Sequence, residues 1–150
     1  MRCKDAPQRC ERHYVYVVTE TIEGQTLARW MTDHPCLTLQ TVRGIVEQIA
    51  RGLQAFYRLE MLHQDLQPHS VMIEQTGTVK IINFGATRVA GVLATAAATH
   101  ARSSILGAAQ YTAPGYFLGL EGTACSDLFS LGVVTHQMLS GRLPAAVWRR

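Results

Sequence analysis

The feature that most constrains this fold is a run of apolar residues with the period of an α-helix. After Thr38, a suitable N-cap, apolar side chains recur every three or four residues. They are Val42, Ile45, Val46, Ile49, Leu53 and Phe56. This spacing places them on one stripe, so we predict a helix over residues 39–59 that buries the stripe in a core.

Two short β-prone runs follow this helix. Residues 71–73 and 79–82 are rich in valine and isoleucine, and they flank Gln75-Thr76-Gly77-Thr78, a turn that contains glycine. They predict a small β-hairpin. A further β-branched and aromatic run, Tyr14 to Val18, predicts a strand, and the polar residues 19–24 predict a connection.

The second half of the chain predicts one more long helix. It should begin at Ser126 and stop near Gly141. The residues expected on its buried side are Leu128, Leu131, Val134, Met138 and Leu139. Residues 86–112 have no steady period, and they predict a mainly extended surface segment.

Composition indicates one globular domain and excludes several classes of protein. The chain has 150 residues, of which 47% are hydrophobic and 17% charged. A net charge of +3, with no clustered basic face, gives no support for nucleic-acid binding. Four cysteines without a CxxC pair predict neither zinc nor disulfides, but reduced thiols. The longest apolar stretch, residues 89–98, is about half a membrane span, so we expect no membrane segment and a cytoplasmic protein.

Four short motifs occur in a fixed order. His63-Gln64-Asp65 lies between the first helix and the hairpin, and Asn83-Phe84-Gly85 follows the second strand. Ala113-Pro114-Gly115 then precedes the helix that opens with Ser126-Asp127. An Asp in a loop is usually a turn cap, which is the ordinary alternative for Asp65. The order of all four motifs is much more specific than any one of them.

This order resembles the eukaryotic-type protein kinase family, whose signatures are H-R-D-L-x-x-x-N, D-F-G and A-P-E. The resemblance covers about residues 13–144. Stretches such as GIVEQIARGLQAF, GTVKIINFGATRVAG and SDLFSLGVVTHQMLSGRLP are similar to the kinase part of bacterial proteins that join a PP2C-like phosphatase to a serine/threonine kinase. The resemblance implies an α+β, protein-kinase-like fold, which is mainly the α-helical large lobe with a hinge strand and a small β-hairpin.

The resemblance also implies a division of the chain. Residues 1–12 are an irregular N-terminal segment, and residues 13–150 are a partial kinase-like domain from the hinge to the second large helix. Residues 1–13 have no counterpart of the glycine-rich loop or of the lysine that grips the phosphates, so we expect the small lobe to be missing.

The positions that carry phosphoryl transfer in the family are partly altered here. Asp65 stands at the catalytic base, and Gln67 stands where many serine/threonine kinases have a lysine that meets the phosphate. The magnesium ligands of the family correspond to Asn83 and Ser70, and both positions are degenerate. Magnesium prefers hard anionic oxygens, so the loss of the aspartate at Asn83 should weaken metal binding most.

The scaffold positions match better than the chemical ones. Backbone groups of Glu20 and Ile22 correspond to the hinge that meets adenine, and Met72 corresponds to the floor of that pocket. His63 is expected to be a packed structural residue, and Asp127 to brace the HxD loop through backbone hydrogen bonds.

The function implied by the resemblance is that of a partial serine/threonine protein kinase domain. Its cofactors would be ATP and magnesium, its reaction phosphoryl transfer to protein serine or threonine, and its partners a protein substrate or another protein. Because the metal ligands and the phosphate lysine are not matched, we expect this chain to be inactive and to bind MgATP poorly. The alternatives are a pseudokinase-type protein-binding module and a non-functional gene remnant.

Overall fold

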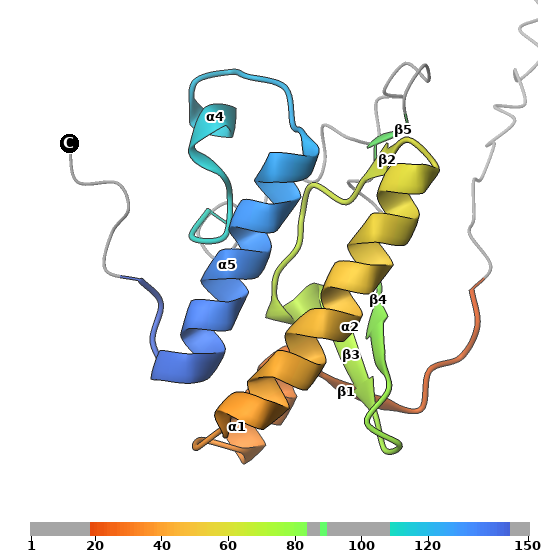
Figure 1. Ribbon diagram of the computed structural model, residues 1–150, viewed down its shortest axis with the longest axis vertical. Coiled ribbons are helices and arrows are strands. Elements are labelled where there is room, and N and C mark those ends of the chain that lie inside the picture. The colour runs from red at the N-terminus through yellow and green to blue at the C-terminus, as the bar shows by residue number, and fades with distance from the viewer. Residues whose placement is uncertain (1–18, 84–87, 90–108, 145–150) are drawn as a thin grey trace, which may run out of the picture.

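The computed structural model of the 150-residue chain describes residues 19–83, 88–89 and 109–144. Two long helices, α2 (Leu39–Arg58) and α5 (Ala124–Ser140), pack against each other, and the small strands lie beside α2 (Figure 1). Helix and sheet are therefore combined in a mixed α+β arrangement.

Helix α2 confirms the prediction made from the apolar period. Its N-cap is Thr38, whose hydroxyl oxygen accepts a hydrogen bond from the Thr41 backbone N–H. The side chains of Val42, Ile45, Ile49 and Leu53 are buried. One face of the helix thus forms the centre of the core.

The predicted hairpin is also confirmed, and it belongs to a three-stranded sheet. Strand β3 (Val71–Glu74) pairs antiparallel with β4 (Val79–Ile81) and, on its other side, with β1 (Gly24–Thr26). Gly77 in the turn has φ +84°, a conformation that glycine adopts without a steric penalty. A second pair joins β2 (Met61–Leu62) to β5 (Arg88–Val89).

Strand β1 and the short helix α1 (Leu27–Asp33) were not predicted from the sequence. The predicted connection over residues 19–24 is irregular only as far as Glu23, because Gly24 already pairs with Glu74. The available signal for α1 was Thr26, whose side chain caps the helix by accepting from the Arg29 N–H.

Helix α5 corrects the predicted second helix in two respects. It begins at Ala124, two residues before the predicted start, because Thr123 and Ser126 form a reciprocal capping box. Leu128 and Leu139 are 50% and 52% exposed, so the prediction that they are buried was wrong. The buried side of α5 includes two polar residues, Asp127 and Ser130, which a search for apolar residues alone could not place. The other buried residues of the helix are Leu131, Val133, Val134 and Met138.

The remaining elements are short. Pro68–Ser70 forms a 3₁₀ turn, η1, directly before β3, and Pro114–Phe117 forms helix α4. The predicted strand at residues 14–18 and the N-terminal segment 1–12 lie outside the described residues, as does most of the predicted extended segment 86–112. No helix in the described part of the chain is both long and apolar enough to cross a membrane.

The core lies where α2, α5, α1 and β3 meet. Its buried members are Leu27, Val42, Ile45, Ile49, Leu53, Leu66, Val71, Ile73, Leu131, Val134 and Met138. Leu66 belongs to the loop between α2 and η1, which is therefore anchored in the core by its own side chain. This anchoring positions the polar residues on either side of it.

Candidate functional site

The loop from Leu59 to Gln67 leads from the end of α2 through β2 to η1, and it carries the HxD motif. Two of its residues, Glu60 and Gln64, have positive φ values of 55° and 66°. A non-glycine residue in this left-handed region costs about 1 kcal/mol, so the loop conformation needs support from its surroundings.

Asp127 supplies much of this support from the first turn of α5. Its Oδ2 accepts a hydrogen bond from the His63 N–H at 2.9 Å, and its Oδ1 accepts from the Gln64 N–H at 2.8 Å. The side chain is only 1% exposed. A buried carboxylate that accepts two backbone hydrogen bonds fixes both amide groups strongly. The geometry fits the bracing role predicted for Asp127.

His63 connects the same loop to the end of β4. Its imidazole is fully buried, Nε2 lies 3.2 Å from the Ile82 carbonyl oxygen, and Nδ1 accepts from the Asp65 N–H at 3.4 Å. Because Nδ1 accepts from a backbone N–H, Nε2 is the ring nitrogen that donates to the Ile82 carbonyl. The Phe56 ring packs edge-on against it, with the ring centroids 6.0 Å apart. His63 thus occupies the packed, structural environment that was expected.

Asp65 and Gln67 contact each other directly. The Gln67 Nε2 donates to Asp65 Oδ1 at 2.9 Å, and both side chains are partly exposed. Burial raises the pKa of the Asp65 carboxyl above its usual value, while the hydrogen bond from Gln67 and the nearby His63 partly oppose that change. A carboxylate with a raised pKa is a stronger proton acceptor. The structure therefore brings together the two predicted catalytic residues.

Ser70 has its hydrogen-bonding capacity committed to the backbone. Its hydroxyl accepts from the Gln67 N–H at 2.9 Å, and it lies 3.0 Å and 2.9 Å from the carbonyl oxygens of Asp65 and Gln67, to which it donates. The residue is fully buried. This arrangement fits a turn-stabilising residue, and it does not fit a ligand directed toward a metal ion.

Asn83 follows Ile82, whose carbonyl oxygen contacts His63, and it lies two residues after the end of β4. It is exposed and has φ 68°, which asparagine tolerates better than most residues. Its amide carries no charge. Because Asn83 is neutral and Ser70 is sealed in a turn, these two positions do not fit a magnesium site. Within the described ranges, no three His, Cys, Asp or Glu side chains gather closely enough to hold a metal.

The three predicted adenine contacts are only partly brought together. Glu20 and Ile22 line a hollow of about 720 Å³ beside β4, and Asn83 lines the same hollow. Met72 is not one of its lining residues. It pairs across the hairpin with Lys80, so these two side chains project from the same face of the sheet.

Lys80 is a residue that the sequence did not single out. Its Nζ lies 2.8 Å from Glu20 Oε2 and 3.1 Å from Glu74 Oε1. The hydrogen bonds to Glu20 and Glu74 raise the pKa of the Lys80 amine. Glu74 could have been found from the alternation along the hairpin, but the link to Glu20 spans sixty positions and has no local signal. The Glu20 side chain is thus tied to β4.

Gly122 shapes the other side of the HxD loop. A Cβ at this position would clash with the Tyr116 hydroxyl oxygen and would lie 2.6 Å from the Gln64 Nε2. Any larger residue here would have to displace the ends of these two side chains. Gln64, which stands at the arginine position of the H-R-D signature, therefore packs against the segment before α5.

Comparison with known proteins identifies the family. The model of the protein kinase domain matches residues 2–148, so this chain belongs to the protein kinase domain family. Relatives that it matches include several bacterial serine/threonine-protein kinases. It is 34% identical to PknA of Corynebacterium glutamicum over 142 residues, which is 94% of this chain and 29% of that protein.

Two further relatives agree. The chain is 33% identical over 129 residues to PrkC of Bacillus subtilis, covering 86% of this chain and 19% of that protein. It is 33% identical over 136 residues to PknA of Mycobacterium tuberculosis, covering 91% of this chain and 31% of that protein. The chain thus spans less than a third of the length of these relatives. The finer likeness to phosphatase–kinase fusion proteins stays a prediction.

Proposed function

We propose that this chain is the large-lobe part, from the hinge to the second large helix, of a serine/threonine-kinase-type domain that keeps the catalytic-loop scaffold without magnesium-dependent phosphoryl transfer. The observation that carries the proposal is the contrast between Asp65, held in a braced loop, and the pair Ser70 and Asn83. The base position is intact, whereas neither metal position offers a charged oxygen.

The magnitude of the loss follows from electrostatics. Phosphoryl transfer depends on metal ions that neutralise charge on the phosphates as the transition state forms. Replacing an anionic ligand by an amide removes an interaction of several kcal/mol, and each 1.36 kcal/mol corresponds to about a tenfold change in rate. The retained Asp65 cannot offset this loss, because a positioned base contributes about 10²- to 10⁴-fold by itself.

Nucleotide binding should be weak and independent of magnesium. Glu20 and Ile22 line one hollow, whereas Met72 is not among the residues that line it. A thermal-shift titration with ATP, with and without magnesium, tests this. We expect no rise in melting temperature that requires magnesium, and such a rise would contradict the proposal.

Activity is tested by transfer of radiolabelled γ-phosphate from MgATP to a generic basic protein. We expect no transfer above that of the Asp65→Ala variant, which removes the base and leaves its neighbours in place. Transfer by the unaltered chain that disappears in Asp65→Ala would overturn the proposal and show an active kinase. Manganese in place of magnesium serves as a second condition, because it accepts the same oxygen ligands.

The same scaffold favours a second role, that of a protein-binding module of the pseudokinase type. The HxD loop, η1 and α5 are joined by buried or partly buried hydrogen bonds that do not involve a nucleotide. A rigid surface of this kind can present side chains to a partner without any chemistry. We therefore also propose that the chain binds a partner protein and that it is located in the cytoplasm, as the sequence predicts.

A further inference from the structure

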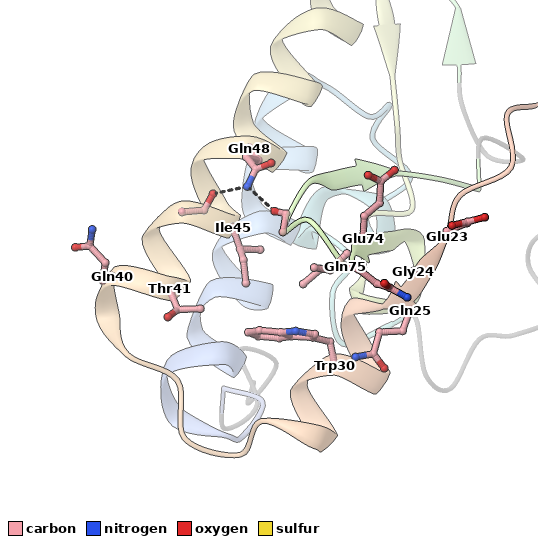
Figure 2. Close-up of a pocket in the computed structure, with 13 residues that line it drawn as sticks. Glu23, Gly24, Gln25, Trp30, Gln40, Thr41, Ile45, Gln48, Glu74 and Gln75 are labelled. Carbon is pink, nitrogen blue, oxygen red and sulfur yellow. Dashed lines mark hydrogen bonds between the residues drawn. The ribbon is translucent and has the colours of Figure 1, made fainter.

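A hollow of about 830 Å³ lies at the N-terminal half of α2, away from the HxD loop. Its walls are α2, α1, β1 and the turn of the hairpin, and Figure 2 shows the Trp30 ring lying across it below Ile45. Ile73 adds a further apolar surface. None of its lining residues belongs to the loop that carries Asp65. Its size is within the range of pockets that bind ligands.

One wall of this hollow is rigid. The Gln48 Nε2 lies 3.3 Å from both the Gly44 and the Gly77 carbonyl oxygens, and its Oε1 accepts from the Val79 N–H at 3.0 Å. The side chain therefore ties the hairpin turn to α2 (Figure 2). A hollow between elements that are joined in this way is formed before any ligand arrives, which lowers the cost of binding.

The strand side of the hollow carries an excess of negative charge. Glu23 and Glu74 both line it, and among the residues that the structure describes no lysine or arginine does. Lys80 is the amine that bridges Glu74 and Glu20, whereas Glu23 makes no ion pair within the described part of the chain. Two carboxylates therefore share one amine, and Glu23 adds a third negative charge. The local field attracts a cationic group.

Three further amide side chains line the hollow. Gln25, Gln40 and Gln75 line it, and none of them makes a side-chain hydrogen bond to another described residue. Each amide offers two N–H donors and a carbonyl acceptor, which is the complement of a peptide backbone. Amides around an apolar floor favour an extended peptide over a simple inorganic cation.

We propose that this hollow docks a basic segment of a partner protein. The segment would place an arginine or lysine at Glu23 and Glu74 and an adjacent aliphatic side chain against Trp30 and Ile45. The indole also favours a nearby cation through its π face. This docking does not depend on phosphoryl transfer, so it is tested independently of the proposed loss of activity.

The test is fluorescence anisotropy with the full chain and a labelled decapeptide that contains two arginines followed by leucines. We expect the peptide to bind, and we expect Glu23→Lys to weaken binding about three- to tenfold, as for one partly exposed charge pair reversed. Glu47→Lys is the matched control, because Glu47 is an exposed residue of α2 outside the hollow. Raising the salt concentration from about 50 to about 500 mM should also weaken binding.

A second pair of variants checks the position of the site. Gln75→Lys adds a cation at the hollow and should weaken binding, whereas Gln54→Lys adds the same charge on an exposed part of α2 outside it. Circular dichroism checks that all four variants are folded. Equal effects within either pair, or equal binding of a peptide with glutamates in place of the arginines, would overturn the proposal.

The other occupant to be distinguished is the chain's own basic N-terminal segment. The test is a variant of the 150-residue chain in which four basic residues are all replaced by glutamine: Arg2, Lys4, Arg9 and Arg12. We expect the affinity for the peptide to be unchanged within about twofold, as for a site that is free in the unaltered chain. An increase of about tenfold or more would show that this segment fills the hollow, and the proposal of a partner protein would be wrong.

Discussion

The HxD loop and the end of β4 are joined by one hydrogen bond, from His63 to the Ile82 carbonyl, yet they are built in opposite ways. On the loop side, Asp127 and Ser70 are buried and hydrogen-bonded to backbone groups. On the strand side, Asn83 is exposed. Buried polar side chains that hold the fold therefore lie on the loop side, and we expect a change of charge to be tolerated at Asn83.

The largest effect is expected at Asp127, the buried carboxylate of this comparison. Asp127→Asn removes the charge and turns an N–H₂ group toward one of two backbone donors, those of His63 and Gln64. We expect a loss of about 2–4 kcal/mol in the free energy of unfolding. Urea denaturation measures it, with Asp33→Asn as the exposed control. Equal losses for the two variants would show that Asp127 does not hold the loop.

A smaller loss is expected at Ser70, in the turn before β3. Ser70→Ala leaves the Gln67 N–H without its acceptor in a buried site. The free energy of unfolding should fall by about 1–2 kcal/mol. The control is Ser140→Ala, which removes an exposed hydroxyl at the end of α5. If Ser70→Ala is as stable as the unaltered chain, the hydroxyl is free for another role, and the argument against a metal ligand there fails.

The reciprocal change at Asn83 should have almost no effect on folding. Asn83→Asp exchanges an exposed amide for an exposed carboxylate at the same backbone conformation, so stability should change by less than about 0.5 kcal/mol. The same variant should bind magnesium more tightly, which isothermal titration calorimetry can measure. If Asn83→Asp destabilised the chain as much as Asp127→Asn does, the HxD loop and the end of β4 would not differ in the way described.

The smallest effect is a pH dependence from Asp65, whose pKa is raised in the folded state by burial. Protonated Asp65 therefore favours folding: this contribution is fully present below the ordinary aspartate pKa of about 4 and is lost as pH rises through the raised value. The Asp65→Asn variant lacks this term. Its stability relative to the unaltered chain should increase as pH rises through this window, as followed by urea denaturation. Parallel profiles would contradict a raised pKa.

Much of the local structure was predictable because it depends on neighbours in the chain. The apolar period predicted α2, and glycine in the turn predicted the hairpin. The second helix was predicted only approximately, because its buried face includes Asp127 and Ser130. Short elements such as α1 escaped notice because seven residues show barely two turns of periodicity.

The features of the candidate site also divide into those that the sequence predicted and those that only the structure showed. The order of motifs singled out Asp65, Gln67, His63 and Asp127, whose roles stay predictions, and the structure places them in or against one loop. The sequence did not show that the Glu20 carboxylate pairs with Lys80, or that Gly122 packs on Gln64. The metal-ligand and adenine-contact assignments at Ser70, Asn83, Ile22 and Met72 stay predictions.

By itself, the sequence determined the two long amphipathic stretches, the hairpin and the string of motifs that indicates a protein kinase, because these are encoded in local spacing. Only the tertiary structure decided which polar groups are sealed and which face solvent. Asp127 reaches the HxD loop across more than sixty positions, and the hollow beside Trp30 is assembled from three separate segments. Burial and hydrogen bonding depend on such distant contacts, and no local period encodes them.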